Sequence, residues 1–385
     1  MIRGLDPARF EAHVLCPPGP AADMFAAAGI PVLAAPVANL THVVDSTYHG
    51  LRWALLGREL FRLPGHWRAL GRALRESQAP IVHLNESTLV FAALAARRRG
   101  RRVVWHVRHV LGPGRRRVLL QRLMRRWADR VVAIDGDVRL CLGDMPQAEV
   151  VHNSVDLALF RPTDERDGVR QELGIPPTAI CVAQIGRLGA AKGSFDFLEA
   201  VRLLPSEVRA DARFLLVGGA MPPPRMLRTR LGRMVRRLAR WSDPRATAER
   251  IVEEGGLGDC VQFVDFWADM PGLYSAIDVA VFPSRLGGIG RPGFEAAACG
   301  KPVVATTVTG NSEGVVDGVT GVLVPAAQPA ALARALSRLV AIPELRAEMG
   351  AKGLDHARRN FDMRANSRAI ADLYERLLTA RGGAA

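Results

Sequence analysis

Hydrophobic and polar positions alternate in blocks along the first part of the chain. Short runs rich in β-branched residues are separated by longer runs in which apolar residues recur every three or four positions. The longer runs predict helices over residues 48–77 and 88–99, and the short runs predict strands in EAHVLC, IPVLAA, APIVHL, RRVVWHV and DRVVAI. Strands and helices in alternation are typical of a parallel sheet with helices on both faces.

The second part of the chain repeats this alternation. Helices are expected over 194–204 and 270–276 and again from 330 to 380, and strands are expected in AICVAQIG, ARFLLVGG, CVQFVDF, DVAVFPS, KPVVATT and GVLV. Each part therefore predicts one doubly wound α/β domain. Such sheets bind ligands at the carboxyl ends of their strands.

The polar segment TDERDG separates the two parts and indicates a linker. We expect a first domain over residues 1–158, a linker over 159–175 and a second domain over 176–360. A C-terminal helix, residues 361–385, is expected to pack back across the domains. No apolar strand with a glycine turn precedes EAHVLC, so the first strand of the first domain is expected to be missing.

Composition agrees with two ordered domains and changes how the charge is interpreted. The 385 residues carry a formal net charge of +14, but only three of the 52 basic residues are lysines, at 192, 301 and 352. A general bias toward arginine therefore accounts for much of the charge. Aromatic residues make up 6% and do not interleave with the cations, which argues against nucleic-acid binding.

The cysteines and the apolar runs bear on the compartment. Five cysteines, at 16, 141, 181, 260 and 299, form no C-x-x-C pair and indicate free thiols in a reducing environment. No apolar stretch approaches the roughly 18 residues that cross a bilayer, and the N-terminus lacks a signal-peptide pattern. We therefore expect a cytoplasmic protein.

The segment PSRLGGIGRPGFEAAACGKPVVATTV, residues 283–308, carries the most specific signal. It predicts a strand end, a glycine loop, a short helix and another strand. Glycines at 287, 288 and 290 leave backbone amides accessible, and Pro292 suits the first turn of a helix. Such a helix start binds phosphate, and Glu295, one turn further on, is placed to accept ribose hydroxyls. The alternative is a plain strand-to-helix turn.

A second loop, IGRLGAAKGSF, points to the same ligand. Gly186 follows a predicted strand, and Arg187 and Lys192 precede a helix that begins near Ser194. Two cations beside a helix N-terminus suit a diphosphate. Because arginine is the default cation in this chain, a lysine in the motif suggests that a compact ammonium is required. The alternative is two surface cations on a loop.

Six blocks in this order resemble the retaining glycosyltransferases of the GT-B fold, the large family 4 group, also described as glycosyl transferases group 1. The blocks are VVHNSVDLALF, IGRLGAAKG, FLLVGG, VQFVDF, LYSAIDVAVFPS and FEAAACGKPVVATTVTGNSEGVVDGVTGVLV. The resemblance implies two Rossmann-like domains facing across a cleft. It also implies transfer of a hexose-type sugar from a nucleotide-diphosphate donor, with retention at the anomeric carbon and without an essential metal or a cofactor.

The resemblance assigns roles to single residues. Arg187 and Lys192 would bind the donor diphosphate, beside Gly186, and Glu295 would bind the ribose. The family's E-x7-E motif has its first glutamate where this chain has Gly287. Arg291, or backbone groups of Gly288 and Gly290, would then contact the transferred sugar in its place, or the donor sugar is unusual, or activity is reduced.

The first domain of this family usually places a histidine near the reacting carbon. The run VVWHVRHV offers His106, Arg108 and His109, and the residues alone do not choose among them. Period-two alternation puts His106 and Arg108 on one face of the strand, with His109 on the loop beyond. A purely structural role is the alternative for each histidine.

A D-x-D pair, Asp135 and Asp137, raises the possibility that the protein is a metal-dependent transferase of the other major glycosyltransferase fold. The pair follows RVVAI at a position where a helix begins, and aspartate is a good N-cap. We therefore interpret it as a cap and expect no metal site.

The segment RMLRTRLGRMVRRLARW, residues 225–241, predicts an amphipathic helix with arginines around an apolar face. It could rest on the anionic inner face of the cell membrane beside a lipid-linked acceptor, helped by the basic helix near 115–130. The alternative is a solvated helix covering its own domain.

The resemblance leaves the acceptor open, and envelope polysaccharide or lipid-linked glycan is the expected class. Two further functions remain. One is a GT-B-type sugar-nucleotide epimerase. The other is a catalytically weakened protein that still binds nucleotide sugars.

Overall fold

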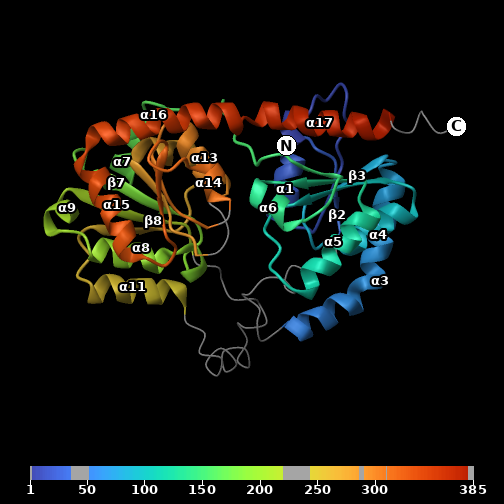
Figure 1. Ribbon diagram of the computed structural model, residues 1–385, viewed down its shortest axis with the longest axis horizontal. Coiled ribbons are helices and arrows are strands. Elements are labelled where there is room, and N and C mark those ends of the chain that lie inside the picture. Colours follow the sequence, from blue (N-terminus) through green and yellow to red (C-terminus); the bar gives the residue numbers. More distant parts are fainter. Residues whose placement is uncertain (1, 36–51, 220–242, 286–289, 309, 380–385) are drawn as a thin grey trace. The chain divides into compact units, whose positions relative to one another are not determined.

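The computed structural model describes residues 2–35, 52–219, 243–285, 290–308 and 310–379 (Figure 1). They form two compact units: Met1–His152 with Arg364–Ala385, and Asn153–Met363. The segment expected as a linker, 159–175, lies inside the second unit. Its helix α7, Arg166–Glu172, packs on α12, Met270–Ala276, and its Arg170 is 1% exposed. The charged segment TDERDG therefore contains the start of α7, and the buried Arg170 follows it in the same helix.

The first unit contains a parallel four-stranded sheet of order β3-β4-β5-β6 and a separate parallel pair, β1-β2. The strands are β1, Val14–Cys16; β2, Val32–Ala34; β3, Ile81–Leu84; β4, Arg102–Val107; β5, Arg130–Ala133; and β6, Ala148–Val150. The helices are the 3-10 turn η1, Ile2–Gly4; α1, Pro20–Ala27; α3, Arg52–Glu76; α4, Val90–Arg98; α5, Arg115–Trp127; α6, Gly136–Cys141; and α17, Met363–Thr379.

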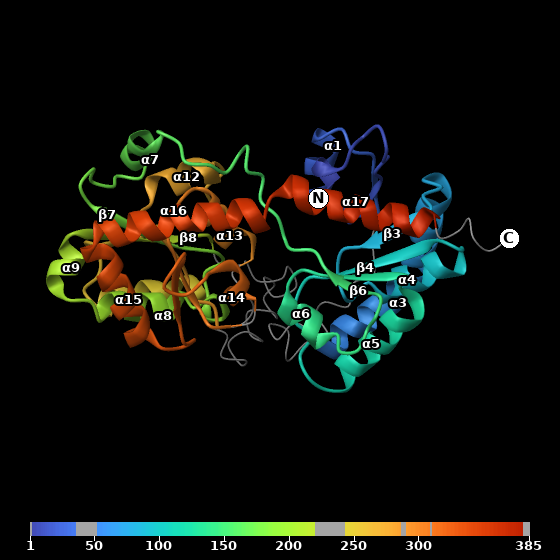
Figure 2. The ribbon, with the colours of Figure 1, turned by 45° about the horizontal axis from the view of Figure 1, so that its top comes forward.

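Both faces of the four-stranded sheet are covered, and the alternation along β4 explains how. Val103, Trp105 and Val107 face a core built with α3, α4, α5 and α6. Val104 faces the opposite core, which α17 completes through Ile370 and neighbouring apolar residues. Figure 2 shows α17 on one side of these strands and α3 to α5 on the other. The C-terminal helix thus returns to the first unit and closes one face of its sheet.

The second unit is a parallel six-stranded sheet of order β12-β11-β10-β7-β8-β9. Its strands are β7, Ile180–Ile185; β8, Ala212–Val217; β9, Val261–Val264; β10, Val279–Phe282; β11, Val303–Thr306; and β12, Gly321–Val324. Its other helices are the 3-10 turn η3, Ala190–Lys192; α8, Ser194–Arg202; α9, Ser206–Ala210; α11, Pro244–Glu254; α13, Arg291–Ala298; α14, Asn311–Gly314; α15, Pro329–Ala341; and α16, Pro343–Asn360.

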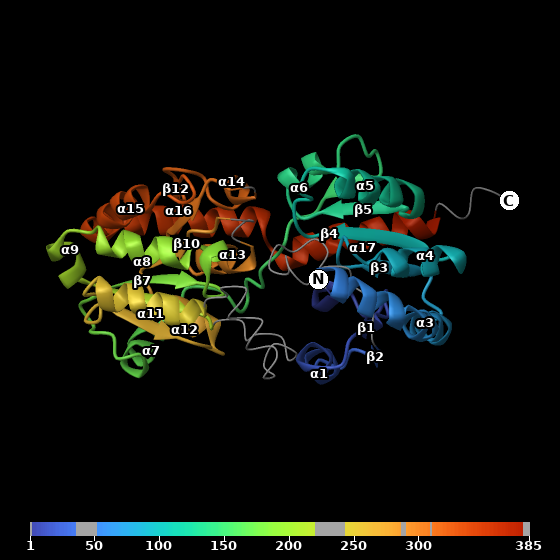
Figure 3. The same ribbon diagram turned by 90° about the horizontal axis from the view of Figure 1, so that it is seen from below.

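Two hydrophobic cores flank this sheet. One packs α8, α11 and α15 against residues such as Val182 and Val281. The other packs α7, α12, α13 and α16 against Ala183 and Ala280, which are adjacent to Val182 and Val281 on the same strands. In Figure 3, seen from below, α8 and α11 lie in front of the strands of this unit and α16 lies behind them. Because both faces of the sheet are covered, its strands appear in the sequence as continuous apolar runs.

The expected α/β class with a parallel sheet in each unit is confirmed, and the strand order of the second unit is doubly wound. In the first unit the four strands instead follow one another in chain order, and β1 and β2 form a separate pair. How the two units face each other stays a prediction. The amphipathic segment 225–241 lies outside the described residues. Among the helices that are described, none is both long enough and apolar enough to cross a membrane.

Candidate functional site

The two loops that the sequence selected leave neighbouring strands of the second unit. β7 and β10 are paired in parallel, so their carboxyl ends lie at the same edge of the sheet. The loops also touch. Gly193, just before α8, has φ 70°, and a Cβ on it would lie 1.7 Å from the carbonyl oxygen of Pro283, just after β10. Only glycine allows this contact.

The β7 loop carries two cations of different exposure. Arg187 is exposed and Lys192, at the end of η3, is half-buried. Burial lowers the pKa of Lys192, and the positive charge of Arg187 lowers that pKa further. Each cation therefore raises the energy of the other, and an anion placed between them would relieve this repulsion. The N-terminus of α8 follows directly and adds the positive end of its dipole.

The β10 loop leads through Gly290, at φ 62°, into α13. Glu295 lies in the second turn of this helix and is 5% exposed. Its Oε1 is 3.2 Å from Nε of Arg291. Burial raises the pKa of Glu295, an effect that the Arg291 charge partly offsets. Gly287 and Gly288 lie outside the described residues.

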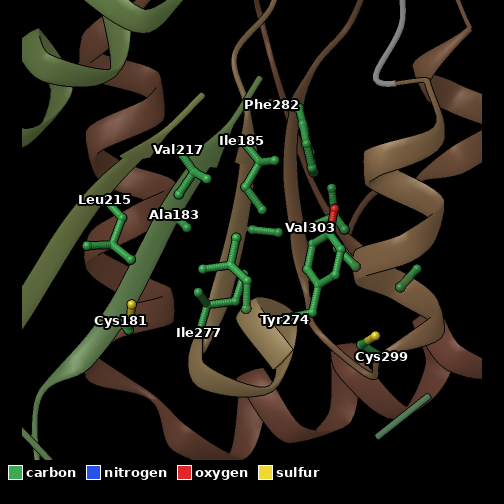
Figure 4. Close-up of a cluster of buried hydrophobic side chains, with 14 of the residues drawn as sticks. Cys181, Ala183, Ile185, Leu215, Val217, Tyr274, Ile277, Phe282, Cys299 and Val303 are labelled. Atoms are coloured by element: carbon green, nitrogen blue, oxygen red, sulfur yellow. The ribbon is translucent and has the colours of Figure 1, made fainter. Parts of the chain in front are cut away.

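Tyr274 of α12 also supports this carboxylate. Its hydroxyl oxygen is 2.9 Å from the Pro292 carbonyl and 3.3 Å from Oε2 of Glu295. Figure 4 shows the ring standing in the core with its oxygen toward the end of the strands where Ile185 and Phe282 lie. Burial raises the pKa of this phenol well above its usual value, so the hydroxyl remains a donor. Sequence reasoning missed Tyr274, because its helical spacing marks only a core position.

In the first unit, two of the three candidates lie at the carboxyl end of β4. Nη1 of Arg108 donates to Oδ1 of Asn85 at 2.9 Å. His109 Nδ1 is 3.3 Å from Oε1 of Glu86, and its Nε2 is 3.2 Å from Oγ of Ser87. The loop after β3 thus holds both side chains. Nothing in the sequence alone connected that loop to this strand.

His106 lies elsewhere, inside the core beneath α17. Its Nδ1 is 3.1 Å from Nε2 of His83, whose Nδ1 is 2.7 Å from the hydroxyl oxygen of Tyr374. His106 is 6% exposed, and its buried Nε2 meets no hydrogen-bond partner among the described residues. The structure therefore buries His106, whereas the loop after β3 holds Arg108 and His109. Burial lowers the pKa of His106, and Arg108 still lies near enough for its charge to lower that pKa further.

The D-x-D pair begins α6. The Asp135 carboxylate accepts a hydrogen bond from the Val138 amide at 2.6 Å, which confirms the N-cap interpretation. Within the described part of the chain, no cluster of three or more histidine, cysteine or acidic side chains is arranged to hold a metal ion.

Two parallel α/β units, with glycine loops and cations at the strand ends of the second, are the architecture of GT-B glycosyltransferases. Family models agree over both units. The model for glycosyl transferases group 1 matches residues 165–356, and that for Glycosyltransferase Family 4 matches residues 1–159. The chain belongs to glycosyltransferase family 4.

Relatives with assigned names support the same family. The chain is 31% identical to the lipopolysaccharide core biosynthesis mannosyltransferase LpsB of Rhizobium meliloti, over 66% of this chain and 68% of that protein. It is 33% identical to D-inositol 3-phosphate glycosyltransferase 2 of Catenulispora acidiphila, over 65% of this chain and 56% of that protein. The match thus spans little more than half the length of the latter relative.

Solved structures agree on the fold. The Anabaena HepE protein in complex with UDP-glucose aligns with a TM-score of 0.77 at 22% identity, over 96% of this chain and 93% of that chain. Sucrose-phosphate synthase from Thermosynechococcus elongatus aligns with a TM-score of 0.67 at 25% identity, over 83% and 78%.

Proposed function

We propose that this chain transfers a sugar from a nucleotide-diphosphate donor to an acceptor hydroxyl, with retention of the anomeric configuration and without a metal. The observation that carries the proposal is the contact between two glycine loops at the ends of β7 and β10. One loop brings Arg187 and Lys192, and the other leads to Glu295. Membership of the family supports a nucleotide sugar as the ligand of this edge.

In this proposal the second unit stabilises the leaving group. As the glycosidic bond breaks, negative charge builds on the diphosphate, and Arg187, Lys192 and the amides at the start of α8 are fixed cations and dipoles beside it. Preorganised charges of this kind cost no rearrangement at the moment of reaction. Glu295, held by Arg291 and Tyr274, accepts the ribose hydroxyls.

The first unit offers the acceptor side. Arg108 and His109, half-buried at the carboxyl end of β4, are better placed for substrate contact than His106, which is buried beside His83. The relatives act, by their names, on lipopolysaccharide core or on an inositol phosphate. For this chain we propose a glycan or lipid-linked acceptor of envelope polysaccharide assembly.

Release of nucleoside diphosphate from a panel of UDP-, GDP- and ADP-sugars, with lipid-linked and free glycan acceptors, tests the activity. We expect release from one donor that depends on an acceptor, and a product whose anomeric proton couplings in NMR match those of the donor. Tight donor binding without turnover on any acceptor would point to a binding protein. Conversion of the donor sugar without acceptor would point to an epimerase.

A further inference from the structure

Arg285, two residues after Pro283, ties the β10 loop to the β7 loop. Its Nε is 2.6 Å from Oδ2 of Asp196 and its Nη2 is 2.5 Å from Oδ1, which is a bidentate ion pair. Its backbone amide also donates to the carbonyl oxygen of Ala191 at 3.0 Å. Bidentate guanidinium–carboxylate pairs fix direction as well as distance.

The two partners differ in burial, and because the carboxylate is the buried one, it requires its partner. The side chain of Asp196, in the first turn of α8, is 8% exposed, whereas that of Arg285 is 46% exposed. A buried carboxylate that loses its partner retains its desolvation cost without compensation. Asp196 therefore holds Arg285 firmly to the start of α8.

The contacts of Arg285 flank Lys192 on both sides along the chain. Ala191 precedes the lysine by one residue, and Asp196 follows it by four. Between them, Gly193 packs against Pro283 without space for a Cβ. The turn that carries the Lys192 ammonium is thus fixed to the end of β10 at three points. Displacing a binding group by about 1 Å is enough to lower activity strongly.

We infer that Arg285 and Asp196 are a positioning pair, which holds the Lys192 turn in the geometry that binds a nucleoside diphosphate. This inference rests on the proposed function, because it assumes that the second unit binds such a ligand. The pair acts through Lys192 and not by contact with substrate. The sequence assigned a role to neither residue: Arg285 lies in the segment 283–308 without a predicted function, and Asp196 follows the end of IGRLGAAKGSF.

The variant Asp196→Asn separates positioning from simple charge. Removing a carboxylate makes the site more positive, so charge alone predicts tighter binding of an anion. Positioning predicts the opposite, because the Lys192 turn loses its anchor. Calorimetric titration of the full chain with UDP, GDP and ADP measures the sign of the change.

We expect Asp196→Asn and Arg285→Gln each to weaken binding of the diphosphate that the wild type prefers by about tenfold. The double variant should bind the diphosphate no more weakly than the single variant with the lower affinity, because the pair acts as a unit. Matched controls lie on the same helix. Glu199→Gln and Arg202→Gln break an exposed 2.8 Å ion pair, with Arg202 50% exposed, and should leave affinity within about twofold.

Several results overturn the inference. Unchanged or tighter binding by Asp196→Asn contradicts it, and so do additive losses in the double variant. The melting temperatures of the variants without nucleotide test for a purely structural role. A variant with a lower melting temperature than the wild type but the same affinity would show that the pair only stabilises the fold, which counts against the inference. If the wild type binds none of the three diphosphates, the proposed function fails and the inference fails with it.

Discussion

At the residue scale, the candidate donor site depends on a backbone position that only glycine can occupy. Gly193 combines a left-handed φ of 70° with a position against the Pro283 carbonyl that leaves no space for a Cβ. The first property concerns local strain, and the second concerns contact between two loops. A matched glycine elsewhere in the second unit separates the two effects.

Gly193→Ala should destabilise the second unit more than Gly174→Ala. Gly174 has φ 65°, and no atom lies within 4 Å of a Cβ built on it, so alanine there adds only strain, about 1 kcal/mol. At Gly193 the overlap with Pro283 should add about 2 kcal/mol more and weaken nucleotide binding. Urea denaturation of both variants measures the difference. Equal losses would show that the loops do not press together at this point.

The sequence predicted the charged residues of this site but not the residues that hold them. Arg187, Lys192 and Glu295 follow from glycine spacing and from the family pattern. The roles of Tyr274 and Arg285 do not follow from these patterns, because each depends on a contact with a residue that is distant along the chain. Pattern reasoning finds groups that act on a ligand through local motifs, whereas support for those groups depends on three-dimensional packing.

At the element scale, α17 closes the first unit through a buried polar chain. Tyr374 of α17 reaches His83 of β3, and His83 reaches His106 of β4. Apolar residues of α17 pack around these three hydrogen-bonded side chains, and Phe10 packs beside Tyr374. Helical periodicity predicted the helix, but not which face of which sheet it covers.

The histidine pair predicts acid sensitivity of the first unit. Burial, and then the Arg108 charge, lowers the pKa of His83 to about 4, from 6.5 for an unhindered imidazole. The unfolded chain therefore binds a proton that the folded unit does not. Stability should fall as pH decreases from about 6.5 and level off below about 4, by roughly 3 kcal/mol in total.

Unfolding free energies at pH 7 and pH 4.5 test this acid sensitivity. His83→Gln should lose less stability between the two pH values than the wild type does. Tyr374→Phe provides the matched control, because it removes one hydrogen bond, about 1 kcal/mol, and keeps both histidines. Equal acid losses in His83→Gln and the wild type would exclude His83 as the cause.

Element boundaries show where prediction from sequence succeeds. The helix expected over 270–276 and the strand in GVLV are found at those residues, because apolar runs and turn residues mark both ends. The segment 159–175 was instead expected as a linker, and it contains α7 with buried Arg170. Five hydrogen bonds from its guanidinium, among them one to Asp278, explain its burial, and a one-dimensional pattern does not reveal them.

At the scale of the whole molecule, we propose a peripheral membrane contact of the first unit, on the grounds of charge and exposed apolar residues. α5 exposes Val118 and Leu119 among its arginines, at 44% and 56%. An exposed apolar pair within a cationic helix suits an anionic lipid surface. Such a contact would place the chain beside a lipid-linked acceptor.

Flotation with anionic vesicles tests the membrane contact. The wild type should float with vesicles of phosphatidylglycerol and lose binding as salt increases. Leu119→Glu should float about fivefold less, whereas Leu140→Glu, a 75% exposed leucine on α6, should float as the wild type does. Equal flotation of the two variants, or no flotation of the wild type, would exclude α5 as the contact.

The central claim is that the loops after β7 and β10 bind the diphosphate of an activated sugar, and one titration tests it most directly. The wild type and Lys192→Ala are titrated with UDP, GDP and ADP, with Lys352→Ala, an exposed lysine paired with Glu348, as control. We predict that one diphosphate binds the wild type and the control equally. Lys192→Ala should bind it at least about tenfold more weakly, at an unchanged melting temperature. Equal affinity of Lys192→Ala and the wild type would contradict the account.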